Sequence, residues 1–326
     1  MKLLKDATVT SDTRVLVRCD LDVPLKGGKI LNTFRLDHCI PTLNYLLDKG
    51  AEITLAGHMG RPKGVVVDAL STKTLKPYFE KKLINNKWEL LENLRFDPRE
   101  RSNDPTLAEI LSSSADIYVN ECFATSHRGH TSFVGVPSLL PAFAGFRLEE
   151  EVTTLGQCLN NPQRPLVAII GGAKFETKIP AVQKFLSFCD YVLVGGKIAR
   201  ESQFLTWAKN IDSSALHSAQ DYAHDGLDIG PRTIADFLKV VSTAKTIIWG
   251  GPMGLYEQGY TQGTEEVASA VANSSAFSVI GGGDTIAVGQ TLNLLDDFDF
   301  VSTGGGAMLD FLANGNLPGL KVLGYV

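Results

Sequence analysis

The sequence predicts an α/β protein built from two domains, each a parallel sheet wrapped by helices. Two observations carry this prediction. Short β-branched, apolar runs alternate with helical patterns along both halves of the chain, which is typical of a parallel sheet covered by helices. The chain also has 326 residues, 44% of them hydrophobic and 21% charged, which is too many for one typical core and enough for two.

In the first half, apolar runs that predict strands are followed by helical patterns. Strands are expected in RVLVRCD, AEITLAGH, WELLENLRF and DIYVNECF, and helices over about 33–49, from Ser71 and from near Asp104. Pro41 lies inside the first of these helices, and an interior proline removes a hydrogen bond and bends a helix. We therefore expect that helix to be kinked or to start late.

The second half repeats the plan. Its expected strands are PLVAIIGG, YVLVGG, TIIWGG, FSVIGGG and DFVSTGGG. A helix is expected between each strand and the next, and the one after TIIWGG is placed around 265–272. Both halves thus predict Rossmann-like, three-layer α/β/α domains. Residues 148–159 have few turn signals and predict a rigid helix that connects the halves. Residues 204–228 show no clear period, so a loop or a short helix is expected there.

Composition excludes several classes of partner. The formal net charge is −5 and no long Lys/Arg run occurs, which argues against nucleic acid or a membrane surface as the main partner. No segment approaches the roughly eighteen uninterrupted apolar residues of a membrane span, and the start lacks a signal peptide, so we expect a cytoplasmic protein. Five widely spaced cysteines without a Cys-x-x-Cys pair predict buried free thiols: Cys19, Cys39, Cys122, Cys158 and Cys189.

The strand ends of the first half carry cations. Ligands of open α/β sheets bind at the carboxyl ends of the strands, so the residues just after each apolar run are informative. Arginine at successive strand ends suits a bidentate grip on phosphate or carboxylate, whereas arginines scattered over helices would be ordinary. The first half therefore predicts a site for a small, strongly anionic substrate. The residues at these ends are Asp20, Asp22, His58, Arg61, Arg95, His127, Arg128 and His130.

The strand ends of the second half carry glycines instead. Of 31 glycines, ten lie in residues 1–160 and 21 in residues 161–326. Glycine-rich turns that lead into helix N-termini present N–H groups to phosphate, although any single pair could simply make a tight turn. Five such runs in one sheet favour a nucleotide. They are Gly171-Gly172, Gly195-Gly196, Gly250-Gly251, Gly281-Gly282-Gly283 and Gly304-Gly305-Gly306.

Neither standard nucleotide fingerprint is present, which disfavours a P-loop protein or an ordinary Rossmann enzyme. Lys174 and Lys178 lie four residues apart where a strand gives way to a helix, so they can share one helical face. Asp284 follows three glycines and precedes Thr285. Its carboxylate would suit a nucleotide-bound Mg²⁺, or it could equally cap a helix.

Ten collinear segments resemble the phosphoglycerate kinase family, nearly from end to end. They are RCDLDVPLKGGKI, NTFRL, GHMGRPKG, LLENLRF, YVNECFATSHRGHTS, AIIGGAKFETKI, GLDIGPRT, IIWGGPMGLYE, VIGGGDT and STGGGA. The resemblance implies a monomeric glycolytic and gluconeogenic enzyme that moves a phosphoryl group between ATP and 3-phosphoglycerate with Mg²⁺. It implies a phosphoglycerate-binding domain over 1–145, a connecting helix over 146–160, a nucleotide-binding domain over 161–306 and a segment over 307–326 that returns to the first domain. Hinge bending would bring the two domains together.

The resemblance also assigns residues. The phosphoglycerate positions are Asp20, Asp22, Arg35, His58, Arg61, Arg95 and Arg128, and the nucleotide positions are Gly172, Lys174, Lys178, Gly195, Gly196, Glu257, Gly282, Gly283, Asp284 and Thr285. Arg35, Lys174 and Lys178 are expected to be catalytic, with Arg35 and Lys178 stabilising the transferring group, and Asp284 is expected to hold Mg²⁺. The acceptor carboxylate has a pKa of about 4 and is already ionised, so no general base is needed.

Three departures from the family pattern are visible. Asp22 stands where the family has Asn, and unless Arg18, Arg35 or a lysine pairs with it, its charge should weaken phosphoglycerate binding. Gly250 replaces another Asn, which predicts looser phosphate orientation. Residues 83–90 and 196–228 are shortened, which puts base and ribose contacts in doubt, and Lys197 adds a cation in place of a glycine.

Two alternatives stay open at this stage. A binding protein derived from the family, with a trimmed pocket that no longer supports turnover, would fit Asp22, Gly250 and the missing segment. A nicotinamide-dependent dehydrogenase fits the α/β pattern, but the absent fingerprint argues against it.

Overall fold

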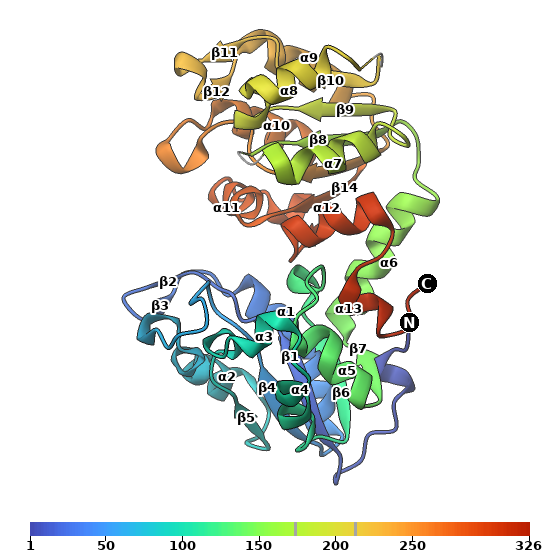
Figure 1. Ribbon diagram of the computed structural model, residues 1–326. Helices are drawn as coiled ribbons and strands as arrows, with labels where there is room; N and C mark the ends of the chain where they lie inside the picture. Colours follow the sequence, from blue (N-terminus) through green and yellow to red (C-terminus); the bar gives the residue numbers. More distant parts are fainter. Residues whose placement is uncertain (173–174, 212–213) are drawn as a thin grey trace. The chain divides into compact units, whose positions relative to one another are not determined.

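The computed structural model of the protein describes residues 1–172, 175–211 and 214–326, except for the side chains of 175–177 and 202–203 (Figure 1). The chain forms two compact units. The first comprises residues 1–153 and 316–326, and the second comprises residues 154–315. The boundary falls within helix α6 (Phe146–Asn160). The predicted α/β class is confirmed, because each unit is built on a parallel sheet.

The sheet of the first unit has five parallel strands in the order β5-β4-β1-β6-β7. The central strand β1 is buried from Val15 to Cys19, because neighbouring strands and covering helices leave neither face open to water. The strands are β1 (Arg14–Cys19), β4 (Glu52–Ala56), β5 (Trp88–Leu90), β6 (Ile117–Glu121) and β7 (Ala142–Ala144). A small hairpin, β2 (Leu25–Lys26) and β3 (Lys29–Ile30), precedes the first helix.

The helices of the first unit are α1 (Phe34–Asp48), α2 (Lys76–Lys82), α3 (Arg99–Ser102), α4 (Pro105–Ser112) and α5 (Val136–Leu139). Helix α1 continues through Pro41 instead of starting after it. The helix expected from Ser71 opens with a 3-10 turn, η3 (Thr72–Leu75), before α2. Asp104 caps α4 by accepting from the N–H groups of Thr106 and Leu107.

The sheet of the second unit has six parallel strands in the order β10-β9-β8-β13-β14-β15. They are β8 (Leu166–Ile170), β9 (Tyr191–Val194), β10 (Leu216–Ser218), β13 (Thr246–Gly250), β14 (Phe277–Gly281) and β15 (Phe300–Ser302). Every residue of β8 and β13 is buried, which explains why their sequences, LVAII and TIIWG, are mostly apolar and do not alternate with polar residues. The helices are α7 (Phe175–Phe185), α8 (Ser202–Ala208), α9 (Pro231–Val241), α10 (Gln262–Ala272), α11 (Gly283–Thr291) and α12 (Gly305–Asn314).

The stretch 204–228 contains more structure than the expected loop or short helix. It holds most of α8, the edge strand β10 and a two-stranded hairpin of β11 (Tyr222–Ala223) and β12 (Asp228–Ile229). These strands have two or three residues, and β10 and β11 are only half-buried. Such short, half-buried strands leave no alternating pattern in the sequence.

The last residues pack against the first unit. Helix α13 (Pro318–Lys321) lies in this segment, and the N–H of Gly319 donates to the carbonyl of Ser126 at 2.8 Å. The carbonyl of Leu323 accepts from the N–H of Lys2 at 2.9 Å. Residues 305–314, which form α12, belong to the second unit, so the segment that joins the first unit starts at 316. Across the described residues, no helix combines the length and apolarity needed to cross a membrane.

Candidate functional sites

Each unit has a topological switch point at which ligands of open α/β sheets bind. In the first sheet, β1 lies between β4 and β6. The strands that follow β1 in the chain, β4 and β5, extend the sheet on one side of it, and the later strands β6 and β7 extend it on the other side. In the second sheet, β8 lies between β9 and β13 in the same way. The residues that follow β1, β4 and β6 in one unit, and β8, β13 and β14 in the other, therefore line the two candidate sites.

Arg18 is a buried cation beneath the first site. It lies near the end of β1 with a relative exposure of 1%. Its Nε donates to Oγ of Ser132 at 2.9 Å, its Nη2 lies 2.7 Å from Nδ1 of His58, and its guanidinium stacks 4.5 Å from the ring of Phe133. From the sequence, Arg18 was expected only as a possible partner of Asp22. The sequence does contain a signal for this role, because an arginine inside an otherwise apolar strand must have a buried partner.

Glu100 supplies a buried counter-charge that sequence analysis missed. Its carboxylate accepts from the N–H of Ser132 at 3.0 Å and from the Oγ of Ser132 at 2.7 Å, so Ser132 links it to Arg18. Burial raises the pKa of Glu100, and the charge of Arg18 opposes that rise. Nδ1 of His130 lies 3.8 Å from Glu100. Burial and then the charges of Arg95 and Arg18 lower the pKa of His130 to about 4.

His58 is a neutral imidazole in this site. It is buried, and burial together with the charges of Arg18 and Arg95 places its pKa well below the ordinary value. A guanidinium can only donate, so Nδ1 of His58 accepts from Arg18 and the ring proton is assigned to Nε2. Nε2 lies 3.7 Å from Oδ2 of Asp22.

Asp20, Asp22 and Arg35 meet at the end of β1. Nε of Arg35, in the first turn of α1, lies 3.4 Å from Oδ2 of Asp20, and its Nη1 donates to the carbonyl of Asp22 at 2.9 Å. The charge of Asp20 raises the pKa of Arg35. Burial raises the pKa of Asp20. The Asp22 carboxylate accepts from the N–H of Gly60 at 2.8 Å and forms no ion pair with Arg18, Arg35 or a described lysine, so the condition under which its charge would be neutralised is not met.

Arg95 completes the cluster, since its Nη1 donates to the carbonyl of Gly60 at 2.8 Å. Burial, followed by the charge of Arg18, lowers the pKa of Arg95. Nε of Arg95 and Oδ2 of Asp20 are buried and make no hydrogen bond with any described residue. Buried polar atoms are rarely left without a hydrogen bond, so these two atoms are candidates for contacts with a ligand. Arg61 and Arg128 are exposed, and the charge of Arg128 helps to lower the pKa of His130.

The glycines of the second site fall into two groups. At Gly171, Gly251 and Gly305 an added Cβ would overlap backbone of the neighbouring strand-end turns, so these glycines are needed for packing. At Gly195 it would approach the sulfur of Met253 within 2.5 Å, and Gly196, with φ +67°, donates its N–H to the carbonyl of Met253. By contrast, a Cβ at Gly172, Gly283 or Gly306 would meet nothing within 4 Å, so there is free space beside these residues for a ligand.

Lys178 and Asp284 are the charged pair of the second site. Burial lowers the pKa of Lys178 to about 8, and the charge of Asp284 opposes that shift. Asp284 is exposed in the first turn of α11, directly after β14. Thr285 is buried, and its Oγ1 accepts from the N–H of Gly251 at 2.9 Å. Glu257 is exposed on η9 (Tyr256–Gln258), and Lys174 lies outside the described residues.

Asp284 fits the requirements of Mg²⁺ only in part. It offers an exposed carboxylate, the hard oxygen ligand that Mg²⁺ prefers. Within the part of the chain that the structure describes, no three His, Cys, Asp or Glu side chains gather as a metal cage. The protein would therefore share the ion with phosphate oxygens, which is the usual way in which Mg²⁺ accompanies a nucleotide.

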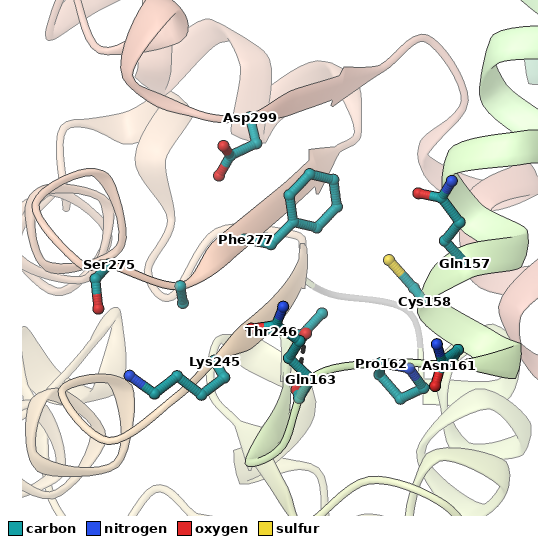
Figure 2. Close-up of a pocket in the computed structure, with 11 residues that line it drawn as sticks. Gln157, Cys158, Asn161, Pro162, Gln163, Lys245, Thr246, Ser275, Phe277 and Asp299 are labelled. Carbon is teal, nitrogen blue, oxygen red and sulfur yellow. Dashed lines mark hydrogen bonds between the residues drawn. The ribbon is translucent and has the colours of Figure 1, made fainter.

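A pocket of about 390 Å³ lies elsewhere on the second unit (Figure 2). It is lined by residues at the amino ends of β13 and β14, including Lys245 and Phe277, and by Gln157 and Cys158 of α6. The amino ends of parallel strands are opposite to the edge at which ligands of such sheets bind. This pocket is therefore distinct from the candidate nucleotide site.

Comparison with known proteins identifies a family for this chain. The model of the family described as Phosphoglycerate kinase matches residues 4–224 and 204–315. Phosphoglycerate kinase of Borrelia garinii subsp. bavariensis is 36% identical, with 99% of each chain covered, and that of Dictyoglomus turgidum is 39% identical, with 95% of each covered. The solved structure of phosphoglycerate kinase from Coxiella burnetii is 33% identical, covers 98% of each chain and superposes with a TM-score of 0.83.

The same comparisons bear on the shortened segments. The alignment with the Borrelia enzyme extends over 389 positions, more than the 326 residues of this chain, so it contains positions at which this chain has no residue. The two ranges matched by the family model overlap over 204–224, inside the stretch predicted to be shortened.

Proposed function

The chain belongs to the phosphoglycerate kinase family and is a phosphotransferase, and we propose that its two units divide the substrates between them. The first unit takes 3-phosphoglycerate, and the second takes ATP or ADP. The reaction is the reversible transfer of a phosphoryl group between ATP and the carboxylate of 3-phosphoglycerate. The assignment of the first site is carried by two buried polar atoms next to Arg35: Nε of Arg95 and Oδ2 of Asp20 make no hydrogen bond with any described residue, and Oδ2 of Asp20 has only the ion pair with Arg35 at 3.4 Å.

The chemistry of the first unit is electrostatic. Arg35 and Arg95 can each grip an anionic oxygen, and Arg18 adds a buried positive charge beneath them. The attacking carboxylate is already ionised at neutral pH, so no base has to take a proton from it. The lowered pKa values of His58 and His130 agree with this, because both rings are neutral near pH 7, and Nδ1 of His58 serves as the hydrogen-bond acceptor for Arg18.

In the second unit, Lys178 and the open backbone serve the phosphates. The N-termini of α11 and α12 direct N–H groups and the positive end of the helix dipole toward the edge where β14 and β15 end. Gly283 and Gly306, in the first turns of these helices, leave room for a phosphate to approach. Phosphoryl transfer spreads negative charge over the equatorial oxygens, and the ammonium group of Lys178 is placed to neutralise part of it.

Asp284, together with phosphate oxygens, would hold Mg²⁺, which supplies charge neutralisation at the phosphates when bound. We also place the protein in the cytoplasm as a monomer, as expected for the family. Its partners are then the two small-molecule substrates.

A coupled assay tests the proposed function. Purified protein, 3-phosphoglycerate, Mg²⁺ and either ATP or GTP are combined, and nucleoside diphosphate is followed. Arg35→Ala and Lys178→Ala should each lower turnover by about two orders of magnitude or more, because each removes charge that stabilises the transition state. The ratio of the ATP and GTP rates reports on the trimmed base pocket.

Two controls match these variants. Arg14→Ala removes an exposed arginine at the start of β1, and Lys184→Ala removes an exposed lysine in the last turn of α7. Both should turn over like the wild type. Near-normal turnover in Arg35→Ala and Lys178→Ala would contradict the assigned roles, and a folded wild type without turnover would contradict the proposed function.

A further inference from the structure

Arg18 is a buried cation that three separate acceptors hold in one orientation. Its guanidinium stacks on the ring of Phe133. Nε donates to Oγ of Ser132, Nη1 donates to the carbonyl of Cys19, and Nη2 donates to Nδ1 of His58. Because a guanidinium is planar and rigid, these three hydrogen bonds fix the position of the whole group.

Glu100 determines the direction of the hydrogen bonds that reach Arg18. Its side chain is fully buried, and both of its oxygens accept from Ser132, Oε1 from the hydroxyl at 2.7 Å and Oε2 from the N–H at 3.0 Å. A carboxylate can only accept and a serine hydroxyl has one proton to give, so this proton points to Glu100. The lone pairs of the hydroxyl are therefore left to accept from Arg18. The carbonyl of Ser132 accepts from the hydroxyl of Tyr118 at 2.7 Å, which holds the backbone of this residue in place.

The network ends at His58, which faces the anion site. Since Nη2 of Arg18 can only donate, Nδ1 of His58 accepts and the ring proton is assigned to Nε2. Among the described residues, Nε2 lies 3.7 Å from Oδ2 of Asp22, which is too far for a hydrogen bond. Burial and then nearby arginines, Arg95 among them, lower the pKa of His58, so a neutral ring lies among the cations of the site. Its Nε2–H group is thus available to an anionic oxygen of a ligand.

We propose that Glu100 is a positioning residue of the phosphoglycerate site. Through Ser132 and Arg18, it holds His58 in the tautomer whose Nε2–H donates to the bound anion. The other neutral tautomer would place an unprotonated nitrogen, which is an acceptor, opposite the negative ligand. This inference rests on the proposed function of the first unit and adds to it a buried residue that itself touches no substrate.

Glu100→Gln tests this role at nearly constant size. A carboxamide has one oxygen and one NH₂ group, so it cannot accept from both the hydroxyl and the N–H of Ser132. If its oxygen faces the N–H, its NH₂ group displaces the hydroxyl proton. If its oxygen faces the hydroxyl, its NH₂ group meets another donor. Either orientation breaks a bond that fixes Ser132 and removes the negative charge beside Arg18, so the tautomer of His58 is no longer imposed.

The first measurement is the tautomer of His58 in the full-length protein without ligand. A two-bond proton–nitrogen correlation spectrum at neutral pH, with nitrogen-15 in the six histidines, distinguishes the two neutral tautomers from the imidazolium. The signal of His58 is identified by its absence in His58→Gln. The wild type should show a neutral ring protonated on Nε2, and Glu100→Gln should lose this single tautomer.

The second measurement is calorimetric titration of the same proteins with 3-phosphoglycerate and, separately, with ATP. Glu100→Gln should bind phosphoglycerate roughly tenfold more weakly, as expected when one hydrogen bond to a charged oxygen is lost. Its affinity for ATP should equal that of the wild type, because Glu100 belongs to the first unit. A general loss of structure would not produce this difference between the two substrates.

Two further variants complete the test. Ser132→Ala removes the hydroxyl between Glu100 and Arg18 and should have the same two effects, so the test does not depend on the folding of Glu100→Gln alone. Glu109→Gln makes the matching change at an exposed position of α4 and should behave as the wild type in both measurements.

The wild-type spectrum needs no variant, and a His58 ring protonated on Nδ1 or on both nitrogens would overturn the inference. Folded Glu100→Gln and Ser132→Ala that keep either the wild-type tautomer or the wild-type affinity for phosphoglycerate would overturn it as well. A wild type that shows the Nε2 tautomer but does not bind phosphoglycerate would overturn the proposed function of the first unit instead.

Discussion

Lys178 shows how burial tunes a single charge in this protein. Removing its ammonium group from water lowers its pKa to about 8, and the nearby Asp284 limits the fall. The charged form still predominates at neutral pH, but only by a modest margin. A lysine is charged below its pKa, so the positive charge available to a phosphate is lost as the pH rises through about 8.

The value of kcat/KM for ATP should therefore fall as the pH rises through about 8, with phosphoglycerate held saturating. The rate is measured from pH 6 to 9.5 in the wild type and in Lys178→Arg, whose charge does not titrate in this range. The residual rate of Lys178→Arg should show no such fall, whereas Lys184→Arg on the same helix should follow the wild type. A wild-type profile that is flat between pH 7 and 9 would refute the assignment of this group.

At the scale of elements, Glu121 holds α1 and α6 against the end of β6. Its Oε1 accepts from Oγ1 of Thr42 and from the N–H of Arg147, both at 2.9 Å, and burial raises its pKa to about 8. Gly145 precedes α6, and an added Cβ there would overlap Oε2 of Glu121. The φ of Gly145 is not in the left-handed region, so the need for glycine is steric.

Gly145→Ala should destabilise the first unit by about 1–3 kcal/mol, the usual range for overpacking a filled core. Gly129→Ala is the matched control, because a Cβ there meets nothing within 4 Å and its φ is also ordinary. Its stability should stay within about 0.5 kcal/mol of the wild type. Urea unfolding, with unchanged m-values, gives the free energy of unfolding of both variants. Equal unfolding midpoints would contradict the prediction, because the residues around Glu121 would then shift to make room for the methyl group at little cost.

At the scale of the whole molecule, the first unit is completed by the far end of the chain. Leu317, Leu320 and Leu323 are buried, and backbone hydrogen bonds join this segment to Ser126 and to Lys2. The second unit, residues 154–315, is thus inserted between two parts of the first. Loss of the last residues should expose apolar surface of the first unit and leave the second sheet whole.

A protein that ends at Gly315 should bind phosphoglycerate more weakly, unfold at a lower temperature and lose turnover, while its affinity for ATP stays near that of the full chain. Calorimetric titrations with each substrate, together with a thermal scan, measure these quantities. Removal of the exposed Val326 alone is the control and should change none of them. An equal loss of affinity for both substrates would contradict this division of the chain.

The sequence by itself determined the fold class and the family. Each helix or strand has its own spacing of apolar residues, so the alternation of such segments can be recognised in the sequence. A strand such as LVAII is recognised as an unbroken apolar run because both of its faces are buried. The edge strand β10 was missed, since three half-buried residues leave no such pattern. At the candidate site, the structure brings together Asp20, Arg35, His58 and Arg95, which were predicted because they follow strands or match family motifs.

Only the tertiary structure determines which side chains the charged residues contact. Arg18 meets His58 and Ser132, which are 40 and 114 residues away in sequence, and Glu100 enters the same network through Ser132. It also decided that Gly171 and Gly251 pack against each other while Gly172 and Gly283 stay open. Sequence patterns encode the period of one segment at a time, whereas ion pairs, burial and pKa depend on which distant segments the fold brings together.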